Sequence, residues 1–203
     1  MKGKHAKVSN GTIIRCNVGV VVGEDVDPPE KGHHKILNVR VLESQEVLYL
    51  DEEGKCSNFK GDGIVFESTH NSAVRNELLG NQNDGVDPMA GYNLIKGNSS
   101  IGNGGRGYNI DGDHNWVIGN QALVNVNDGI EIDEGVGTKV IRNIAIGNGN
   151  RGIEVRDKAQ NSSIKFKKAI FNGSRDLQDR NDDCDDNRWR WNTFDTSKPD
   201  CIQ

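Results

Sequence analysis

The sequence predicts an all-β fold, a single-domain right-handed parallel β-helix of about seven coils with about 22 residues each. Three observations support this prediction. Short markers recur at a fixed spacing, the residues after one marker alternate between apolar and polar, and glycine and asparagine are frequent where a helical repeat would need a leucine framework.

The repeat keeps one register through four consecutive coils. An asparagine is followed five residues later by a second asparagine and four residues after that by a glycine, in steps of 22, 22 and 23 residues. Stacked coils bring equivalent side chains about 4.8 Å apart, where amides can hydrogen-bond from coil to coil. We interpret the asparagines as structural ladders and the glycines as giving a positive φ or a tight corner before a strand. The first asparagines of the four coils are Asn76, Asn98, Asn120 and Asn143.

The residues after each glycine predict a short strand with one buried face. The first and third positions are apolar in almost every coil, as in Ile64 and Phe66, and the position between them faces the other way. Towards the N-terminus the pattern extends through Gly19 and Val47, with a loop around residues 27–32 and an irregular stretch over 24–62. We therefore expect strands of the β-helix after both Gly19 and Val47.

Composition narrows the class of partner and the compartment. The formal net charge of −5 argues against a nucleic-acid partner, and no apolar run is long enough to span a membrane. An even number of cysteines in a glycine- and asparagine-rich solenoid is typical of an exported protein. We expect a secreted, periplasmic or cell-surface location, with any signal peptide outside this chain. A disulfide is predicted between Cys184 and Cys201, and the pairing of Cys16 and Cys56 stays open.

The chain divides into a β-helix over residues 1–175 and a C-terminal capping segment over residues 176–203. The capping segment is highly charged but carries Trp189, Trp191 and Phe194, which we expect to pack over the last coil. No cap precedes the first coil, so that end is open to an upstream domain or to self-association.

The coils over residues 97–111, 119–133 and 142–156, together with the tail over 186–201, resemble the pectate-lyase-like superfamily of right-handed β-helix repeat proteins. This resemblance implies a long polysaccharide lying along the strand face. It leaves the activity open, because the fold carries lyases, hydrolases, epimerases and non-catalytic proteins.

Two enzyme motifs can be compared residue by residue. The string from Asp84 to Met89 is similar to the Tyr-Gly-Phe-Asp-Pro-His string of mannuronan epimerases, so Asp87 carries over as its carboxylate. Asp84 and Met89 stand where that family has Tyr and His, and methionine cannot exchange a proton. The polygalacturonase strings are absent at most of their catalytic positions.

The aligned coils bring polar residues into three rows on one strand face. Six of them are candidate catalytic residues: Asp84, Asp87, Arg106, Asp128, Glu131 and Glu154. Four are candidate substrate-binding residues: Asn109, Asp111, Asp133 and Arg151.

This face admits three interpretations. Ca²⁺ could be shared by Glu131 with Glu154, or by Asp111 with Asp133, through oxygen ligands. A carboxyl pair could hydrolyse a glycosidic bond. The third interpretation is a solvated face whose acids are balanced by Arg106, Arg151 and Arg156.

The leading functional hypothesis is an extracellular protein that binds a uronate-containing polysaccharide along the strand face and acts on it as a lyase, epimerase or hydrolase. The alternative is a non-catalytic structural or adhesive module of a larger surface protein. Whether the chain is an enzyme stays open from the sequence.

Overall fold

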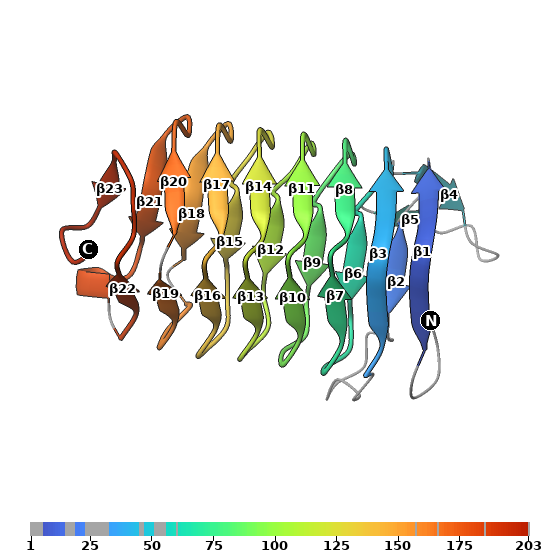
Figure 1. The fold of residues 1–203 in the computed structure, drawn as a ribbon, viewed down its shortest axis with the longest axis horizontal. Coiled ribbons are helices and arrows are strands. Elements are labelled where there is room, and N and C mark those ends of the chain that lie inside the picture. The colour runs from blue at the N-terminus through green and yellow to red at the C-terminus, as the bar shows by residue number, and fades with distance from the viewer. Residues whose placement is uncertain are drawn as a thin grey trace.

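The structure is a computed structural model that describes residues 6–14, 19–22, 33–44, 47–50, 56–59, 61–156, 158–165, 167–184 and 186–202. Its strands stack in parallel along one axis, with the N- and C-terminal ends at opposite ends of the solenoid (Figure 1). The predicted all-β parallel solenoid is confirmed, with about six turns where the sequence suggested seven.

An eight-stranded parallel sheet, here called sheet B, forms the face behind the plane of Figure 1. The apolar residues on either side of the central position of these strands, such as Ile64 and Phe66, are fully buried in the core, as the alternation predicted. Its strands, in spatial order, are β2 Val20–Val22, β6 Ile64–Phe66, β9 Val86–Pro88, β12 Tyr108–Ile110, β15 Ile130–Ile132, β18 Arg151–Val155, β21 Arg175–Asp179 and β23 Ser197–Lys198.

A thirteen-stranded sheet, sheet A, forms the front face and is made of two rows of short strands that the long strand β3 (Lys35–Leu42) joins. The strand β1 (Lys7–Ile14) pairs in parallel with β3 at the N-terminal end. The first row is β7 Ser72–Val74, β10 Leu94–Lys96, β13 Trp116–Ile118, β16 Lys139–Ile141, β19 Ser163–Lys165 and β22 Arg188–Arg190. The second row is β8 Glu77–Leu79, β11 Ser99–Ile101, β14 Gln121–Leu123, β17 Ile144–Ile146 and β20 Lys168–Ile170.

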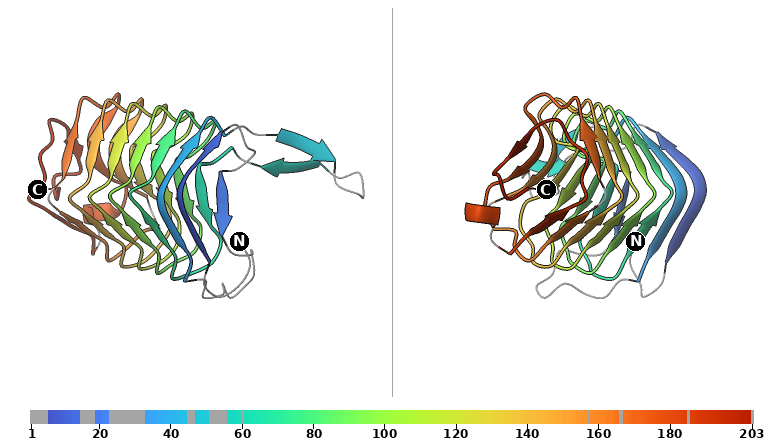
Figure 2. Two further views of the ribbon diagram at one scale, coloured as in Figure 1. Left: turned by 45° about the vertical axis from the view of Figure 1, so that its right-hand side comes forward. Right: turned by 60° about the vertical axis from the view of Figure 1, so that its left-hand side comes forward.

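The segment after Val47 is not a strand of the β-helix, so that prediction was wrong. Strand β4 (Val47–Leu50) pairs antiparallel with β5 (Cys56–Phe59) in a separate two-stranded sheet, and this hairpin projects from the N-terminal end of the solenoid (Figure 2). Sheet B passes directly from β2 to β6. The predicted loop over 27–32 and the residue Cys16 lie outside the described residues.

Three asparagine ladders line the turns, one more than the sequence analysis identified. At Asn76 and its equivalents, each side-chain oxygen accepts the backbone N–H of the preceding coil, as in Asn98 to Asn120 at 2.9 Å. The same pattern repeats at Asn81 and its equivalents. The third ladder runs through Asn71, Asn93 and Asn115. Buried backbone groups at the turns thereby find partners without water.

The glycine markers are required by close packing and not by a positive φ. A Cβ atom on Gly129 would lie 2.6 Å from the carbonyl oxygen of Gly152 and 3.0 Å from the Cβ of Ala145. Positive φ occurs instead at the bends of sheet A, for example at Gly97 and Gly119. Of the two roles that the sequence left open, the tight corner is the right one.

The C-terminal segment continues the sheets instead of only covering the last coil. Strand β22 pairs with β19 and β23 pairs with β21. Trp189 is buried and its indole N–H donates to Asp179 at 2.8 Å, and the predicted disulfide joins Cys184 to Cys201. Trp191 was expected to pack inside but is 62% exposed, because it occupies a bend that faces solvent. The residues Asp182–Cys184 form a 3₁₀ turn, η1.

Candidate functional site

The predicted site residues lie together on the outer face of sheet B, in rows that run along the solenoid. Register pairing places Asn109 beside Glu131 and Glu131 beside Glu154 on adjacent strands. The side chains are not solvated as a simple strand face would be. Asp84, Asp87, Asp128, Glu131 and Glu154 are all at most 3% exposed. The third interpretation is therefore right about the balancing arginines and wrong about solvation, because arginine side chains from neighbouring coils lie across the acids.

Arg106 joins acids of the two coils on either side of its own. Its guanidinium lies 2.8 Å from Glu131 and 3.9 Å from Asp84, and the side chain keeps 27% of its surface exposed. Arg156 approaches the same Glu131 oxygen at 3.6 Å and pairs with Asp133 at 3.0 Å. A buried carboxylate needs such partners, since an uncompensated charge in the interior is strongly unfavourable.

Arg151 and Arg180 hold the C-terminal half of the network. Arg151 lies 3.3 Å from Glu154 and 3.8 Å from Asp128, and it also donates to Gln178 at 2.6 Å. Arg180 donates to the other oxygen of Glu154 at 2.5 Å. The side chain of Arg151 is 16% exposed and that of Arg180 is 35% exposed, so solvent reaches this half of the site along both arginines.

Asp128, Glu131 and Glu154 form a compact carboxyl cluster in which one oxygen from each lies within 4.8 Å of the others. Burial, followed by the neighbouring acids, raises the pKa of Asp128 to about 7. Burial also acts to raise the pKa of Glu131, but the charge and hydrogen bond of Arg106 outweigh it, so this pKa lies below its usual value. Burial raises the pKa of Glu154 despite Arg180 and Arg151. Near neutral pH the cluster therefore contains a carboxyl that holds a proton next to one that is ionised.

A second cluster, Asp62, Asp84 and Asp87, lies at the N-terminal end of the same face. Asp62 accepts the backbone N–H of Asp84, and Asp84 accepts that of Arg106 at 2.5 Å. These two acids therefore close the corner between coils, a structural role similar to that of the asparagine ladders. Asn109 donates to Asp87 across one rung at 3.4 Å.

The carboxyl cluster does not fit a resident Ca²⁺. Glu131 and Glu154 are close enough to share an ion, but Arg106, Arg151 and Arg180 already neutralise them. Calcium needs six to eight oxygen ligands, and here it would have to displace guanidinium groups. The proposed reaction does not depend on this ion. At the other predicted pair, Asp133 is bound to Arg156, and Ca²⁺ at Asp111 with Asp133 stays a prediction that calorimetry with and without the ion tests.

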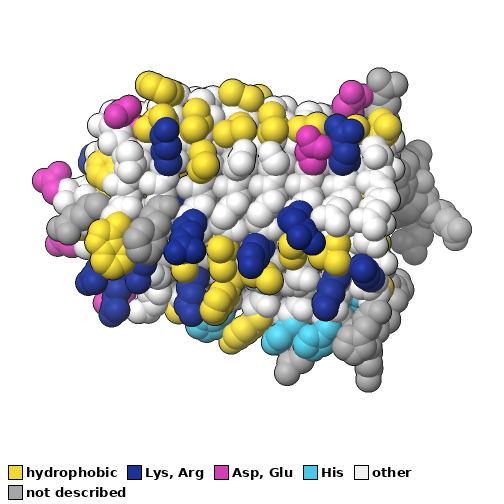
Figure 3. Space-filling view, in the orientation of Figure 1, with side chains coloured by type: hydrophobic (Ala, Val, Ile, Leu, Met, Phe, Trp, Pro, Cys, Tyr) yellow, Lys and Arg dark blue, Asp and Glu magenta, His cyan; other side chains and the backbone are white. Residues whose placement is uncertain are grey.

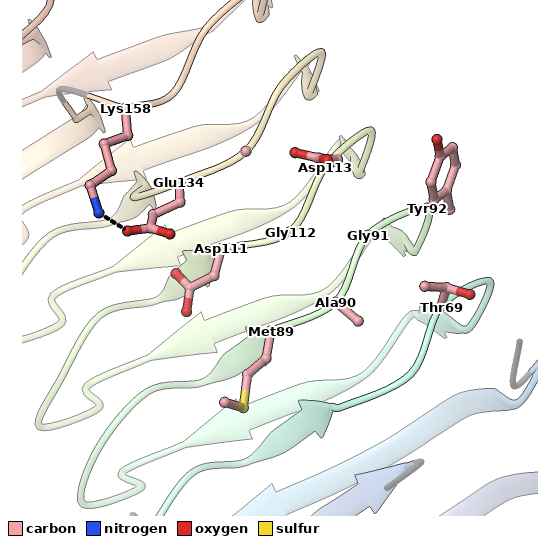
Figure 4. Close-up of a pocket in the computed structure, with 11 residues that line it drawn as sticks. Thr69, Met89, Ala90, Gly91, Tyr92, Asp111, Gly112, Asp113, Glu134 and Lys158 are labelled. Carbon is pink, nitrogen blue, oxygen red and sulfur yellow. Dashed lines mark hydrogen bonds and ion pairs between the residues drawn. The ribbon is translucent and has the colours of Figure 1, made fainter. Parts of the chain in front are cut away.

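A depression of about 490 Å³ opens beside this face, where the chain leaves the strands of sheet B (Figure 4). The side chains of Met89, Asp111 and Glu134 follow one another along it, and Tyr92 and Asp113 stand at its far rim. Lys158 pairs with Glu134 across the depression. Tyr92 stacks against His70 at 5.3 Å and contacts His114 at 5.0 Å between ring centroids. The predicted binding residue Asp111 thus lines a hollow large enough for a sugar ring.

We expect Asp128→Asn to stabilise the protein more at pH 8 than at pH 4.5. The pKa of Asp128 is raised on folding, so its contribution to stability is full below its unfolded value of 3.8 and is lost as pH rises through about 7. Asparagine keeps the oxygen that accepts the Arg151 N–H and removes the titration. The melting temperature of the variant minus that of the wild type should be more positive at pH 8. An equal difference at both pH values would contradict the raised pKa.

From the sequence, Arg156 was expected only as a balancing charge, and Arg180 was not recognised as a member of the site. Arg180 follows Arg156 by 24 residues and occupies the next coil, whereas the regular step is 22 or 23. An alignment that allowed one more residue in that coil would have found it.

Comparison with known proteins supports the fold. The family model of the right-handed β-helix region matches residues 34–184. A similar solved structure is a double mutant of the periplasmic alginate epimerase AlgG, at 17% identity and a TM-score of 0.47. The match covers 90% of this chain and 38% of that one, so the chain spans well under half of the length of that protein. No curated protein matches the sequence. Within the described residues, no helix has the length and apolar character to cross a membrane.

Proposed function

The chain belongs to the right-handed β-helix family, and from this premise we propose that it binds a uronate-containing polysaccharide along sheet B and hydrolyses its glycosidic bonds. The observation that carries the proposal is the carboxyl cluster, in which the pKa of Asp128 is about 7 and that of Glu131 is lowered. Two carboxyl groups whose environments push their pKa values apart are typical of a general acid beside an ionised partner.

The arginines supply the contacts to the glycan. The arginine side chains of the network are all partly exposed, from 16% at Arg151 to 37% at Arg156, so the carboxylate of a uronate meets guanidinium groups first. Planar guanidinium groups bind carboxylates through paired hydrogen bonds. In pairing with the ligand they turn away from Glu131 and Glu154, which opens the carboxyl cluster to the glycosidic bond.

In the proposed reaction, Asp128 gives its proton to the glycosidic oxygen as the bond to the anomeric carbon breaks. The ionised Glu131 attacks that carbon and forms a glycosyl ester, and water then hydrolyses the ester and returns a proton to Asp128. The short separation within the cluster favours this retaining route, since inverting pairs stand roughly 6.5–9.5 Å apart. The location expected for such a protein is outside the cytoplasm, consistent with the disulfide.

The proposal is tested with polygalacturonate, polymannuronate, polyguluronate and a neutral glucan. We expect new reducing ends from a polyuronate with retained anomeric configuration. Asp128→Asn and Glu131→Gln should each lower kcat by about 100-fold or more, because each removes a proton-transfer or nucleophilic group. Asp182→Asn, an exposed acid in η1, is the matched control and should keep full activity.

Other products would indicate a different reaction. Unsaturated uronates detected by ultraviolet absorbance would replace hydrolysis by elimination, and a changed epimer ratio without cleavage would replace it by epimerisation. If no polyuronate is altered, the non-catalytic alternative, a structural or adhesive module, stands instead.

A further inference from the structure

The first row of sheet A carries a band of positive charge on the face opposite sheet B. Its six strands contain five basic residues and no acidic one: Lys96, Lys139, Lys165, Arg188 and Arg190. Arg75 and Arg142 add to it at the bends that follow β7 and β16. Figure 3 shows these Lys and Arg side chains running along the length of the molecule. The band contrasts with the net charge of −5 of the whole chain.

Four cations of this band are not used in ion pairs within the described part of the chain. Among the described residues, Lys96, Lys165, Arg188 and Arg190 form no ion pair with a carboxylate, in contrast to the arginines on sheet B. Lys139 lies over the ring of Trp116, with 4.2 Å from its Nζ to the ring centroid. Unpaired cations that repel one another along a rigid sheet are a cost for folding, and a bound polyanion would remove it.

Two exposed tryptophans lie on the same surface. Trp116 in β13 is 46% exposed, and Trp191, directly after β22, is 62% exposed. An aromatic ring beside a cation suits a sugar acid, because the ring packs against the apolar face of the sugar while the cation pairs with its carboxylate.

We propose that the first row of sheet A is a second binding surface, separate from sheet B, for a linear acidic polysaccharide that lies along the solenoid axis. The band places about one cation on each rung, and rungs repeat every 4.7–4.9 Å or so. Such widely spaced charges match a polymer with one carboxylate per sugar better than duplex DNA, which carries one charge per about 1.7 Å of axis. The flat strands also offer no element that enters a groove. This surface would keep the protein bound to the polysaccharide whether or not sheet B is catalytic.

The test is binding of polygalacturonate by the full chain, measured by calorimetry at low and moderate salt, beside neutral dextran and single- and double-stranded DNA. Every measurement is made in the Asp128→Asn background, which prevents turnover and leaves any binding through the arginines of sheet B the same in all variants. We expect Lys96→Ala with Lys165→Ala to weaken polygalacturonate binding about tenfold and to reduce its salt dependence. Trp116→Ala should weaken it at both salt concentrations.

The matched control removes two charges outside the first row, with Arg40→Ala, whose partner is Glu77, and Lys168→Ala in β20. This control should bind as the background protein does. Equal weakening by the control would show a general charge effect and overturn the surface. Absence of polygalacturonate binding at low salt, or unchanged affinity in the Lys96 and Lys165 double variant, would also overturn it. If single- or double-stranded DNA bound more tightly than polygalacturonate, the band would be assigned to nucleic acid instead.

Discussion

Replacing Asn120 by alanine should lower the melting temperature by roughly 10 °C. The side chain is fully buried, and its oxygen accepts both the backbone N–H and the amide of Asn98. Its own amide donates to the carbonyl of Ile95 at 2.9 Å and to Asn143 at 3.0 Å. Alanine removes all four bonds and leaves buried polar groups unsatisfied, at a cost of about 4 kcal/mol. In a protein of this size each kcal/mol lowers the melting temperature by about 2–4 °C.

The exposed Asn127 provides the control for this variant. It lies two positions after Asn125 on the solvent side of the turn. Its backbone N–H donates to the carbonyl of Gly105, so this hydrogen bond does not involve the side chain. Asn127→Ala should therefore change the melting temperature by no more than a degree or so. Thermal unfolding followed by circular dichroism gives both values. If the two variants melted together, the ladder would not be the source of stability.

Lys167→Asn should instead raise the melting temperature, by about 5–10 °C. Lys167 occupies the position of the ladder between Asn143 and Asn192, since its backbone N–H donates to Asn192 at 3.3 Å. Its side chain is only 2% exposed, and the ammonium nitrogen has no hydrogen-bond partner in the described part of the chain. Asparagine would restore the ladder and remove a buried unpaired group, together worth about 2–4 kcal/mol.

The gain from Lys167→Asn should shrink as pH rises from 7 to 10. Burial lowers the pKa of Lys167 in the folded chain well below its unfolded value of 10.5. At pH values between the folded and the unfolded pKa, the unfolded chain therefore binds one more proton than the folded chain. Wild-type stability therefore rises with pH over this window, and the variant lacks that contribution. Lys168→Asn, one residue later and exposed, should have little effect at either pH. A gain that stayed constant with pH would show that Lys167 is not held neutral.

The repeat explains how much of the fold was predictable. Marker spacing and alternation identify the sheet B strands from β6 to β18, because each coil repeats the same local requirements: an amide at each bend, no Cβ at each corner and apolar residues facing inwards. The same spacing placed Val47 in the β-helix by accident. An aliphatic residue at the correct offset does not distinguish a strand of the solenoid from one of a projecting hairpin.

The candidate site was predictable as a set of rows but not as an environment. Equal spacing puts Asp128, Glu131 and Glu154 on neighbouring coils, and the structure confirms that they meet. Their burial depends on Arg106, Arg151 and Arg180, whose long side chains reach across coils from other positions of the repeat. The amino-acid sequence alone does not give the direction in which a flexible side chain points.

The sequence by itself therefore determined the solenoid, two of its three asparagine ladders and the disulfide, since all of these depend on residue type at a regular spacing or on a single pair of cysteines. Only the tertiary structure decided which charges are used and which are free. On sheet B, acids and arginines from adjacent coils lie close enough to neutralise one another and to separate the pKa values of Asp128 and Glu131. On the first row of sheet A, the same stacking aligns basic residues on strands that carry no acid, and four of them form no ion pair among the described residues, because charge compensation acts through space and not along the chain.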